Sequence, residues 1–141
     1  MIFGNDPGQY RQFFLETWRK YCNGTALEPL ESMVAQIIAV HPEYHALLES
    51  PDTVDQDYGP ESGQSNPFLH MGLHIAIQEQ LAADRPAGIR DIYQRLVHGH
   101  ADPHQAEHRM TECLAESIWE AQRKGGAPDE AAYLERLRNL L

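Results

Sequence analysis

Residues 66–83, NPFLHMGLHIAIQEQLAA, form a segment that is apolar on nearly every face of a 3.6-residue period. Leu73, Ile77 and Leu81 share one stripe of this segment. The Asn-Pro dipeptide at its start is typical of a helix N-terminus, because Asn caps exposed backbone N–H groups and proline is tolerated at the first helical position. The pattern predicts a buried central helix, against which the rest of the chain packs.

The segments on either side of this helix also carry helical signals. An acidic residue stands before a proline at 6–7 and again at 102–103, and Asn23-Gly24 is typical of a helix end. No segment alternates with period two. Further helices are expected over residues 7–22, 30–41, 43–49, about 88–97, 103–124 and 128–141, with a kink or break at Pro42 and with Pro86 and Pro128 as helix openers. The chain is predicted to be all-α, a helical bundle of about five to six helices with a four-helix core, in a single domain over residues 1–141.

Residues 50–65, SPDTVDQDYGPESGQS, lack apolar periodicity and are rich in Asp, Gly, Pro and Ser. Such a composition is typical of a loop. Since this loop exceeds the usual length of about 12 residues, it is interpreted either as a cover for a functional site or as a mobile connection.

Charge and hydropathy exclude several classes of partner. The 141 residues include 21 acidic and 11 basic side chains, for a formal charge of −10 with 8 neutral histidines. Nucleic-acid and anionic membrane surfaces attract clustered Lys and Arg, so neither is an expected partner. No apolar run reaches the roughly 18 residues that span a bilayer. With no secretory signal in residues 1–8 and no paired cysteine motif, a cytoplasmic location is expected.

The histidines are unevenly distributed, because all eight lie between His41 and His108. Four pairs are separated by four residues, namely 41/45, 70/74, 100/104 and 104/108. Random placement in this window would give about 0.8 such pairs, and the four-residue step stacks side chains on one helix face. Because imidazoles bind metals, this spacing predicts pairs of ligands on successive helical turns.

Helix phase predicts where two of these pairs point. His70 and His74 lie within the apolar 66–83 segment, while His104 and His108 lie with Glu107 on the apolar arc of the 103–124 helix. That arc is predicted to contain Met110, Leu114, Ala115, Ile118, Trp119 and Ala121. Imidazoles and a carboxylate directed into a core need partners, because an unsatisfied buried polar group costs about 1–3 kcal/mol.

Helical bundles build zinc and di-iron sites from imidazole and carboxylate groups that converge from facing helices. HMGLH at 70–74 and HALLE at 45–49 each supply a ligand pair at i,i+4, and the 103–124 helix adds a third. The candidate ligands of a divalent iron or zinc ion are His45, Glu49, His70, His74, His104 and His108. The sequence leaves open whether 70/74 joins 104/108 or 45/49. His98 and His100 are interpreted as structural.

The two cysteines, Cys22 and Cys113, lack the local support of a nucleophile. Cys113 is predicted on the polar arc of its helix beside Glu112, which disfavours its thiolate.

Three segments, NPFLHMGLHIAIQEQLAADRPAGI (66–89), HPEYHALLE (41–49) and AEHRMTECLAESIWEAQRKGGAPDEAAYLERLR (106–138), resemble a bacterial family of short proteins known only as a domain of unknown function. The resemblance covers most of the chain and implies no particular activity.

Two further likenesses concern the ligand pattern alone. The order His-x-x-x-Glu then His-x-x-x-His is similar to the ligand order of hemerythrin-like bundles. This resemblance implies a di-iron site. The chain departs from that pattern because Arg109 and Cys113 stand five residues beyond His104 and His108, where the family has Asp. The number of histidines also resembles bundles of the damage-inducible, bacillithiol-transferase type, in which three histidines hold one divalent metal.

A metal-binding helical protein is therefore the expected function, with an open metal position that activates water or dioxygen if the site is catalytic. Glu107 or Glu112 would then act beside the metal or as general base. The alternative is a non-catalytic interaction module, in which the histidines are structural and the acidic surface meets a basic partner. The sequence does not decide whether the partner is a small molecule or a protein. A homo-oligomer also stays open, because the apolar residues of 132–141 suit packing on the bundle or on another chain.

Overall fold

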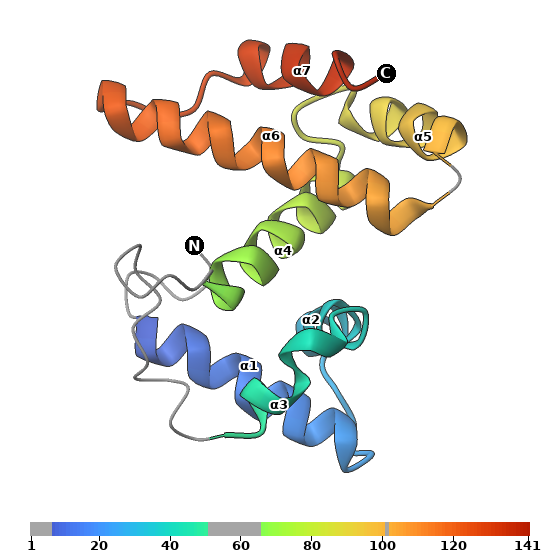
Figure 1. Ribbon diagram of the computed structural model, residues 1–141, viewed down its shortest axis with the longest axis vertical. Helices are drawn as coiled ribbons and strands as arrows, with labels where there is room; N and C mark the ends of the chain where they lie inside the picture. The colour runs from blue at the N-terminus through green and yellow to red at the C-terminus, as the bar shows by residue number, and fades with distance from the viewer. Residues whose placement is uncertain (1–6, 51–65, 101) are drawn as a thin grey trace. The chain divides into compact units, whose positions relative to one another are not determined.

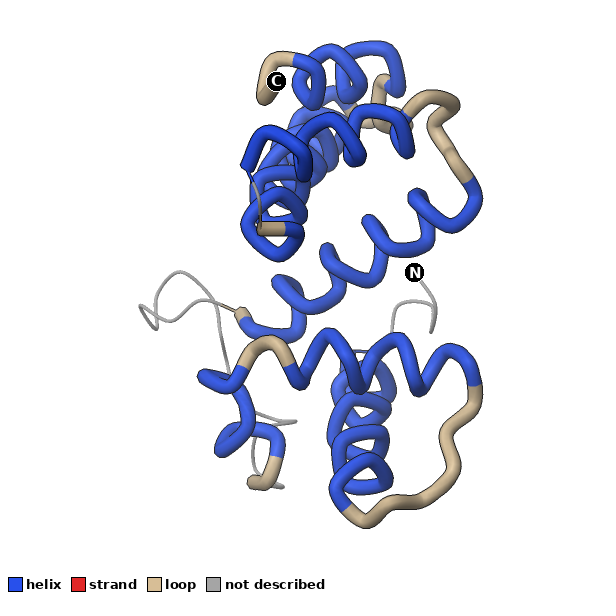
Figure 2. The backbone as a smooth tube through the Cα atoms, turned by 90° about the vertical axis from the view of Figure 1, so that its right-hand side faces the viewer, coloured by secondary structure: helices blue, strands red, loops and turns tan. Residues whose placement is uncertain are grey.

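The computed structural model describes residues 7–50, 66–100 and 102–141, and its regular structure within these ranges is entirely helical (Figure 1). Figure 2 shows the same elements as tubes, with no strand in the described part of the chain. The predicted all-α fold is confirmed. The elements are α1 (Pro7–Cys22), α2 (Pro29–Ala39), the 3-10 helix η1 (Pro42–Tyr44), α3 (His45–Leu48), α4 (Pro67–Ala83), α5 (Ile89–His100), α6 (Pro103–Lys124) and α7 (Glu130–Arg138).

The chain divides into two compact units, residues 1–71 and residues 72–141. We call them the first and the second unit. The boundary lies within α4, which contributes its first residues to the first unit and the remainder to the second. The interpretation of the whole chain as one domain stays a prediction. Among the described residues, no helix combines the length and the apolar character that crossing a membrane requires.

The first unit packs α1 against α2 and α3. Phe14 and Trp18, one turn apart on α1, are buried, and the ring of Phe14 meets that of Phe68 edge-on at 5.7 Å between centroids. Lys20 Nζ donates to the buried Glu31 Oε2 at 2.8 Å and links α1 to α2. Phe14 and Trp18 therefore lie on the face of α1 that builds this core.

Local signals fix the helix ends of the first unit. Glu28 and Glu31 form a capping box at the start of α2, with the Glu28 backbone N–H donating to Glu31 Oε1 at 2.9 Å. Pro42 cannot continue α2 because it lacks an N–H donor, and the chain enters η1 instead. The expected break at Pro42 is confirmed.

In the second unit α6 packs against α5 and α7. The residues of this core share an exposed fraction below one tenth. They are Ile77, Ile89, Ile92, Leu96, Ala106, Met110, Cys113, Leu114, Tyr133 and Leu137. Polar contacts connect the same helices, since Arg136 on α7 donates to Ser117 on α6 at 2.8 Å and lies 2.6 Å from Glu120.

The predicted caps at Asn66 and Asp102 are confirmed, because both side chains accept from backbone N–H groups at the starts of α4 and α6. Gly125 ends α6 in the left-handed region at φ 76°, where a residue with a Cβ is strained. The expected opening of a helix at Pro86 is wrong, because α5 begins only at Ile89. The cap expected at Asp6 lies outside the described residues.

Three expectations for α6 and its surroundings need correction. Trp119 is 56% exposed, with the Arg123 guanidinium 4.7 Å from its ring centroid, and Ala115 is also exposed, so the buried arc is narrower than predicted. Cys113 is buried rather than on a polar face. α7 begins at Glu130 with Asp129 as its cap, two residues later than Pro128 suggested.

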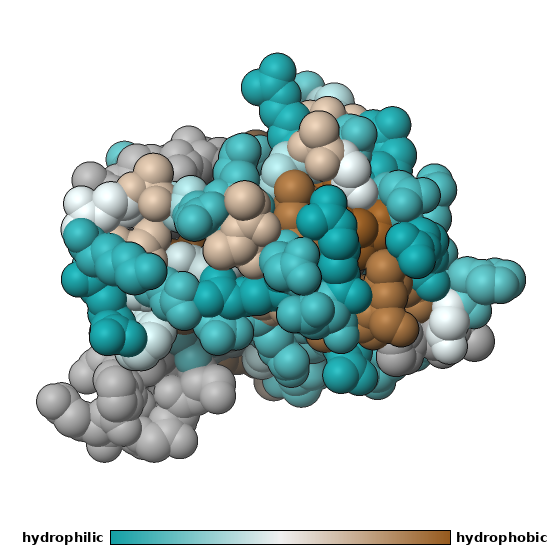
Figure 3. Space-filling view, turned by 90° about the horizontal axis from the view of Figure 1, so that it is seen from above, coloured by the Kyte–Doolittle hydropathy of each residue, from teal (hydrophilic) through white to brown (hydrophobic). Residues whose placement is uncertain are grey.

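Hydrophilic side chains cover most of the surface that Figure 3 presents, with apolar side chains gathered in one area. Large apolar residues that are exposed in the described chain are Tyr21, Val40, Leu69, Trp119 and Leu141. Hydrophilic side chains therefore predominate on this face of the described chain.

Candidate metal centre

The second unit gathers three histidines from two helices. His74 lies on α4 with an exposed fraction of 1%, while His104 and His108 lie one turn apart on α6 and are half-buried. Asp102 caps α6 by accepting from the His104 backbone N–H at 3.0 Å, which fixes where its first turn begins. The i,i+4 spacing then places both α6 imidazoles on one face of the helix.

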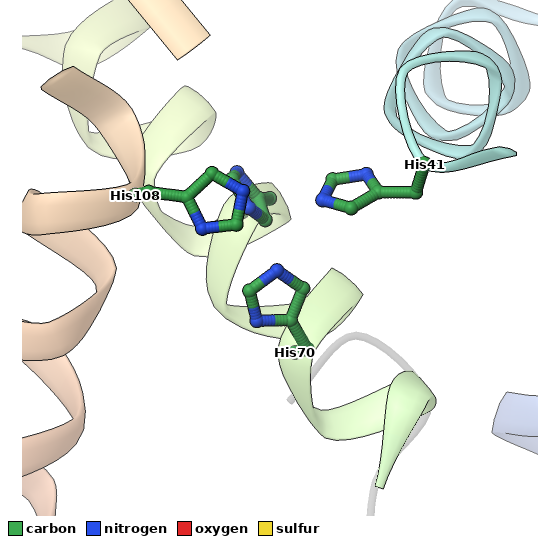
Figure 4. A group of neighbouring side chains, drawn as sticks. His41, His70 and His108 are labelled. Carbon is green, nitrogen blue, oxygen red and sulfur yellow. The ribbon is translucent and has the colours of Figure 1, made fainter. Parts of the chain in front are cut away.

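The three rings are in mutual contact. His104 Nε2 and His108 Nε2 lie 3.0 Å apart, and the two rings are nearly perpendicular. The His74 ring stacks on that of His104 at 5.6 Å and meets that of His108 edge-on at 4.8 Å between centroids. Ring nitrogens of His74 and His108 lie within 4.8 Å of each other. Figure 4 shows the imidazole of His108 projecting from α6. His74, His104 and His108 therefore form one group of contacting imidazoles, which we call the histidine cluster.

A buried carboxylate connects α6 to His74. Glu107 is 9% exposed, and its Oε2 lies 3.3 Å from His74 Nδ1. Its other oxygen, Oε1, accepts from Gln78 Nε2 at 2.7 Å. Burial raises the pKa of Glu107, but hydrogen bonds from His74 and Gln78, together with charge interactions with His74 and His104, outweigh burial and hold the pKa below its usual value. The carboxyl is therefore ionised at neutral pH.

A second pair of histidines belongs to the first unit. The buried His41 follows α2, and its Nδ1 lies 2.7 Å from the carbonyl oxygen of Ile37. Its ring stacks on Tyr44 at 5.6 Å and meets the ring of His70 edge-on at 5.1 Å (Figure 4). Ring nitrogens of His41 and His70 lie within 4.8 Å of each other. The carbonyl contact fixes the ring plane of His41.

The other predicted ligands of the first unit have different surroundings. His45 Nε2 lies 2.9 Å from the carbonyl oxygen of Ile38, and its ring lies 4.4 Å from that of Trp18 between centroids. Glu49 is exposed and lines a groove of about 360 Å³ together with residues of α1 such as Leu15. The structure thus places His45 against a backbone carbonyl and Glu49 at a groove edge.

The remaining candidates lie at the surface or outside the described part. Glu112, weighed as a possible base, is exposed on α6, and so is His98 on α5. The side chain of His100 and residues 51–65, interpreted as a loop and a possible cover, lie outside the described residues. Glu107 is thus the acidic residue of α6 that contacts the histidine cluster.

Sequence reasoning did not assign Gln78 a role. Gln78 lies four residues after His74 on the same face of α4, and its amide holds the Glu107 carboxylate. The i,i+4 spacing was the available signal. The contact of Gln78 with Glu107 on α6, however, depends on how the two helices pack, which spacing within one helix does not predict.

The comparisons with known proteins identify a family. A family model described as Domain of unknown function (DUF1841) matches residues 6–139. The chain belongs to this family. The expected membership of a family known only as a domain of unknown function is thereby confirmed. No curated protein and no solved structure matches the chain.

Proposed function

We propose that the second unit binds a divalent metal ion, zinc or iron, through His74, His104 and His108. The observation that carries this proposal is the separation of 3.0 Å between the Nε2 atoms of His104 and His108. Two nitrogens bonded to one tetrahedral zinc ion at about 2.05 Å are about 3.3 Å apart, which is close to the observed separation. His74 contacts both rings, has a ring nitrogen within 4.8 Å of one of His108, and would supply the third nitrogen.

The donor set favours an ion with an open position. Imidazole nitrogens suit zinc and iron, and three protein ligands leave a fourth tetrahedral position for water. Catalytic zinc sites have this arrangement, whereas structural sites use four protein ligands. The function that the donor set supports best is therefore a metal centre that activates a bound water molecule, or dioxygen if the ion is iron.

Other predicted ligands are not needed for this proposal. His70 precedes His74 by one turn of α4 but belongs to the first unit, and its assignment as a ligand stays a prediction. The assignment of His45 and Glu49 as ligands stays a prediction. The proposal omits His45 because its Nε2 already lies 2.9 Å from a backbone carbonyl oxygen.

A second candidate function is a non-catalytic module with structural histidines. The observation that favours it is that His74 contacts Glu107 and that the same 3.0 Å separation suits an N–H···N hydrogen bond between His104 and His108. If a metal ion joins the two rings, the chain should take up metal. If a hydrogen bond joins them, it should not.

Calorimetric titration of the chelator-treated, tag-free chain with zinc and, without oxygen, with ferrous iron tests the proposal. We expect one ion per chain to bind, His108→Ala to abolish this binding, and His98→Ala, an exposed matched control, to leave it unchanged. Absence of binding to the wild-type chain, or equal effects of the two variants, would contradict the proposal and favour the structural module.

A further inference from the structure

We infer that Glu107 and Gln78 are positioning residues that hold His74 in the tautomer with its proton on Nδ1, so that the Nε2 lone pair serves as the metal ligand. The part about metal binding rests on the proposed function. The part about the tautomer does not, because it concerns the metal-free chain.

Hydrogen-bond polarity gives the tautomer. The oxygens of a carboxylate accept hydrogen bonds, so the ring nitrogen that faces one of them donates. His74 Nδ1 lies 3.3 Å from Glu107 Oε2, and the two side chains have exposed fractions of 1% and 9%. In a neutral imidazole the proton on Nδ1 leaves the lone pair on Nε2.

Gln78 determines which carboxylate oxygen faces His74. Its Nε2 donates to Glu107 Oε1 at 2.7 Å, which leaves Oε2 for His74. Gln78 and His74 lie one turn apart on α4, so the carboxylate from α6 is held by two donors on one helix face. This arrangement restrains the carboxylate in position and orientation.

The arrangement also has a consequence for affinity. A metal-binding histidine that donates its second N–H to a carboxylate is a more basic ligand with a fixed ring orientation. Loss of such a partner commonly lowers metal affinity by about 10- to 100-fold. Glu107 is adjacent to His108 on α6, so one helix carries two proposed ligands and the group that orients the third.

The first experiment measures the tautomer directly. Long-range ¹H–¹⁵N spectra of the imidazoles in the metal-free chain at pH 8 separate Nδ1-protonated from Nε2-protonated rings. We expect His74, assigned by comparison with His74→Leu, to show the Nδ1–H form as its main population. A main population with the proton on Nε2 would overturn the inference whether or not the chain binds metal.

The second experiment measures zinc affinity by competition with a chelator. We expect Glu107→Gln to bind zinc at least about tenfold more weakly than wild type. The matched control Glu112→Gln removes the same charge from an exposed site of α6 and should bind like wild type. Gln78→Leu keeps all three proposed ligands and should also weaken binding, which preserves the test if Glu107→Gln fails to fold.

The outcomes separate the two proposals. If the wild-type chain binds no zinc or iron, the proposed function fails, and the spectra of the metal-free chain still decide the tautomer. If the wild-type chain binds zinc and both Glu107→Gln and Gln78→Leu bind it equally well, the positioning role is refuted while the metal site stands.

Discussion

Replacing His74 by leucine in the metal-free chain should destabilise it, and replacing Glu107 by leucine as well should cost less than the two separate losses added together. His74→Leu removes one of the two donors to a carboxylate that is 9% exposed. Hydrogen bonds to charged groups contribute about 1.5–3 kcal/mol to stability. Because 3.3 Å exceeds the usual 2.7–2.9 Å of such bonds, we expect a coupling near the lower end, about 1.5 kcal/mol.

The assay is urea unfolding of wild type, both single variants and the double variant, with a chelator present at pH 7.5. At this pH the lowered pKa keeps Glu107 ionised. His74→Leu combined with Glu112→Leu is the control pair, and its effects should add because Glu112 is exposed. A coupling between His74 and Glu107 below about 0.3 kcal/mol would refute the reasoning, since it is indistinguishable from additivity.

Three further predictions concern ligand linkage, thiol reactivity and helix termination. Zinc at 100 times its Kd should increase the free energy of unfolding by about 2.7 kcal/mol in wild type but not in His108→Ala, as measured by urea unfolding. A thiol reagent should react rapidly with the exposed Cys22 and with Cys113 only after unfolding, because burial first, and then Glu116 and Glu112, raise the pKa of the Cys113 thiol; equal rates in the folded chain would contradict this. Gly125→Ala should lower the unfolding free energy by about 1 kcal/mol, because φ at this residue is 76° and a Cβ strains the backbone there. A Cβ at this position would meet no atom within 4 Å, so this backbone strain is the only expected effect. An unchanged urea midpoint would exclude such strain.

Local sequence signals predicted most helix boundaries. Asn66 and Asp102 stand before proline and cap α4 and α6 as expected, because capping depends on backbone N–H groups within two or three residues. The start of α5 was not predicted by Pro86. There the side chain of Asp84 accepts from the Arg90 backbone N–H, a contact that spans the turn before the helix.

The directions of side chains were predicted less well where tertiary packing decides them. Helix phase placed Trp119 on the buried arc, but it is more than half exposed and covered on one side by Arg123. The expected disfavouring of the Cys113 thiolate agrees with its raised pKa, but burial is the main cause and the acidic neighbours come second. Helix phase predicts the direction in which a side chain leaves its helix. It does not predict which neighbouring element packs against that side chain.

The candidate site shows the same limit. The four-residue spacing identified His104 and His108 as a pair, and their rings do meet. It could not choose between facing helices, because contacts between helices far apart in the sequence are not encoded in local spacing. His45 illustrates this, since it has the same spacing from Glu49 but lies against the Ile38 carbonyl oxygen.

Elemental analysis of tag-free protein, purified without added metal or chelator, tests the central proposal most directly. The histidine cluster predicts close to one zinc or iron ion per chain, and a content that falls below one tenth in His108→Ala. A wild-type content below one tenth, together with no change in melting temperature on addition of zinc or, without oxygen, ferrous iron, would contradict the metal centre.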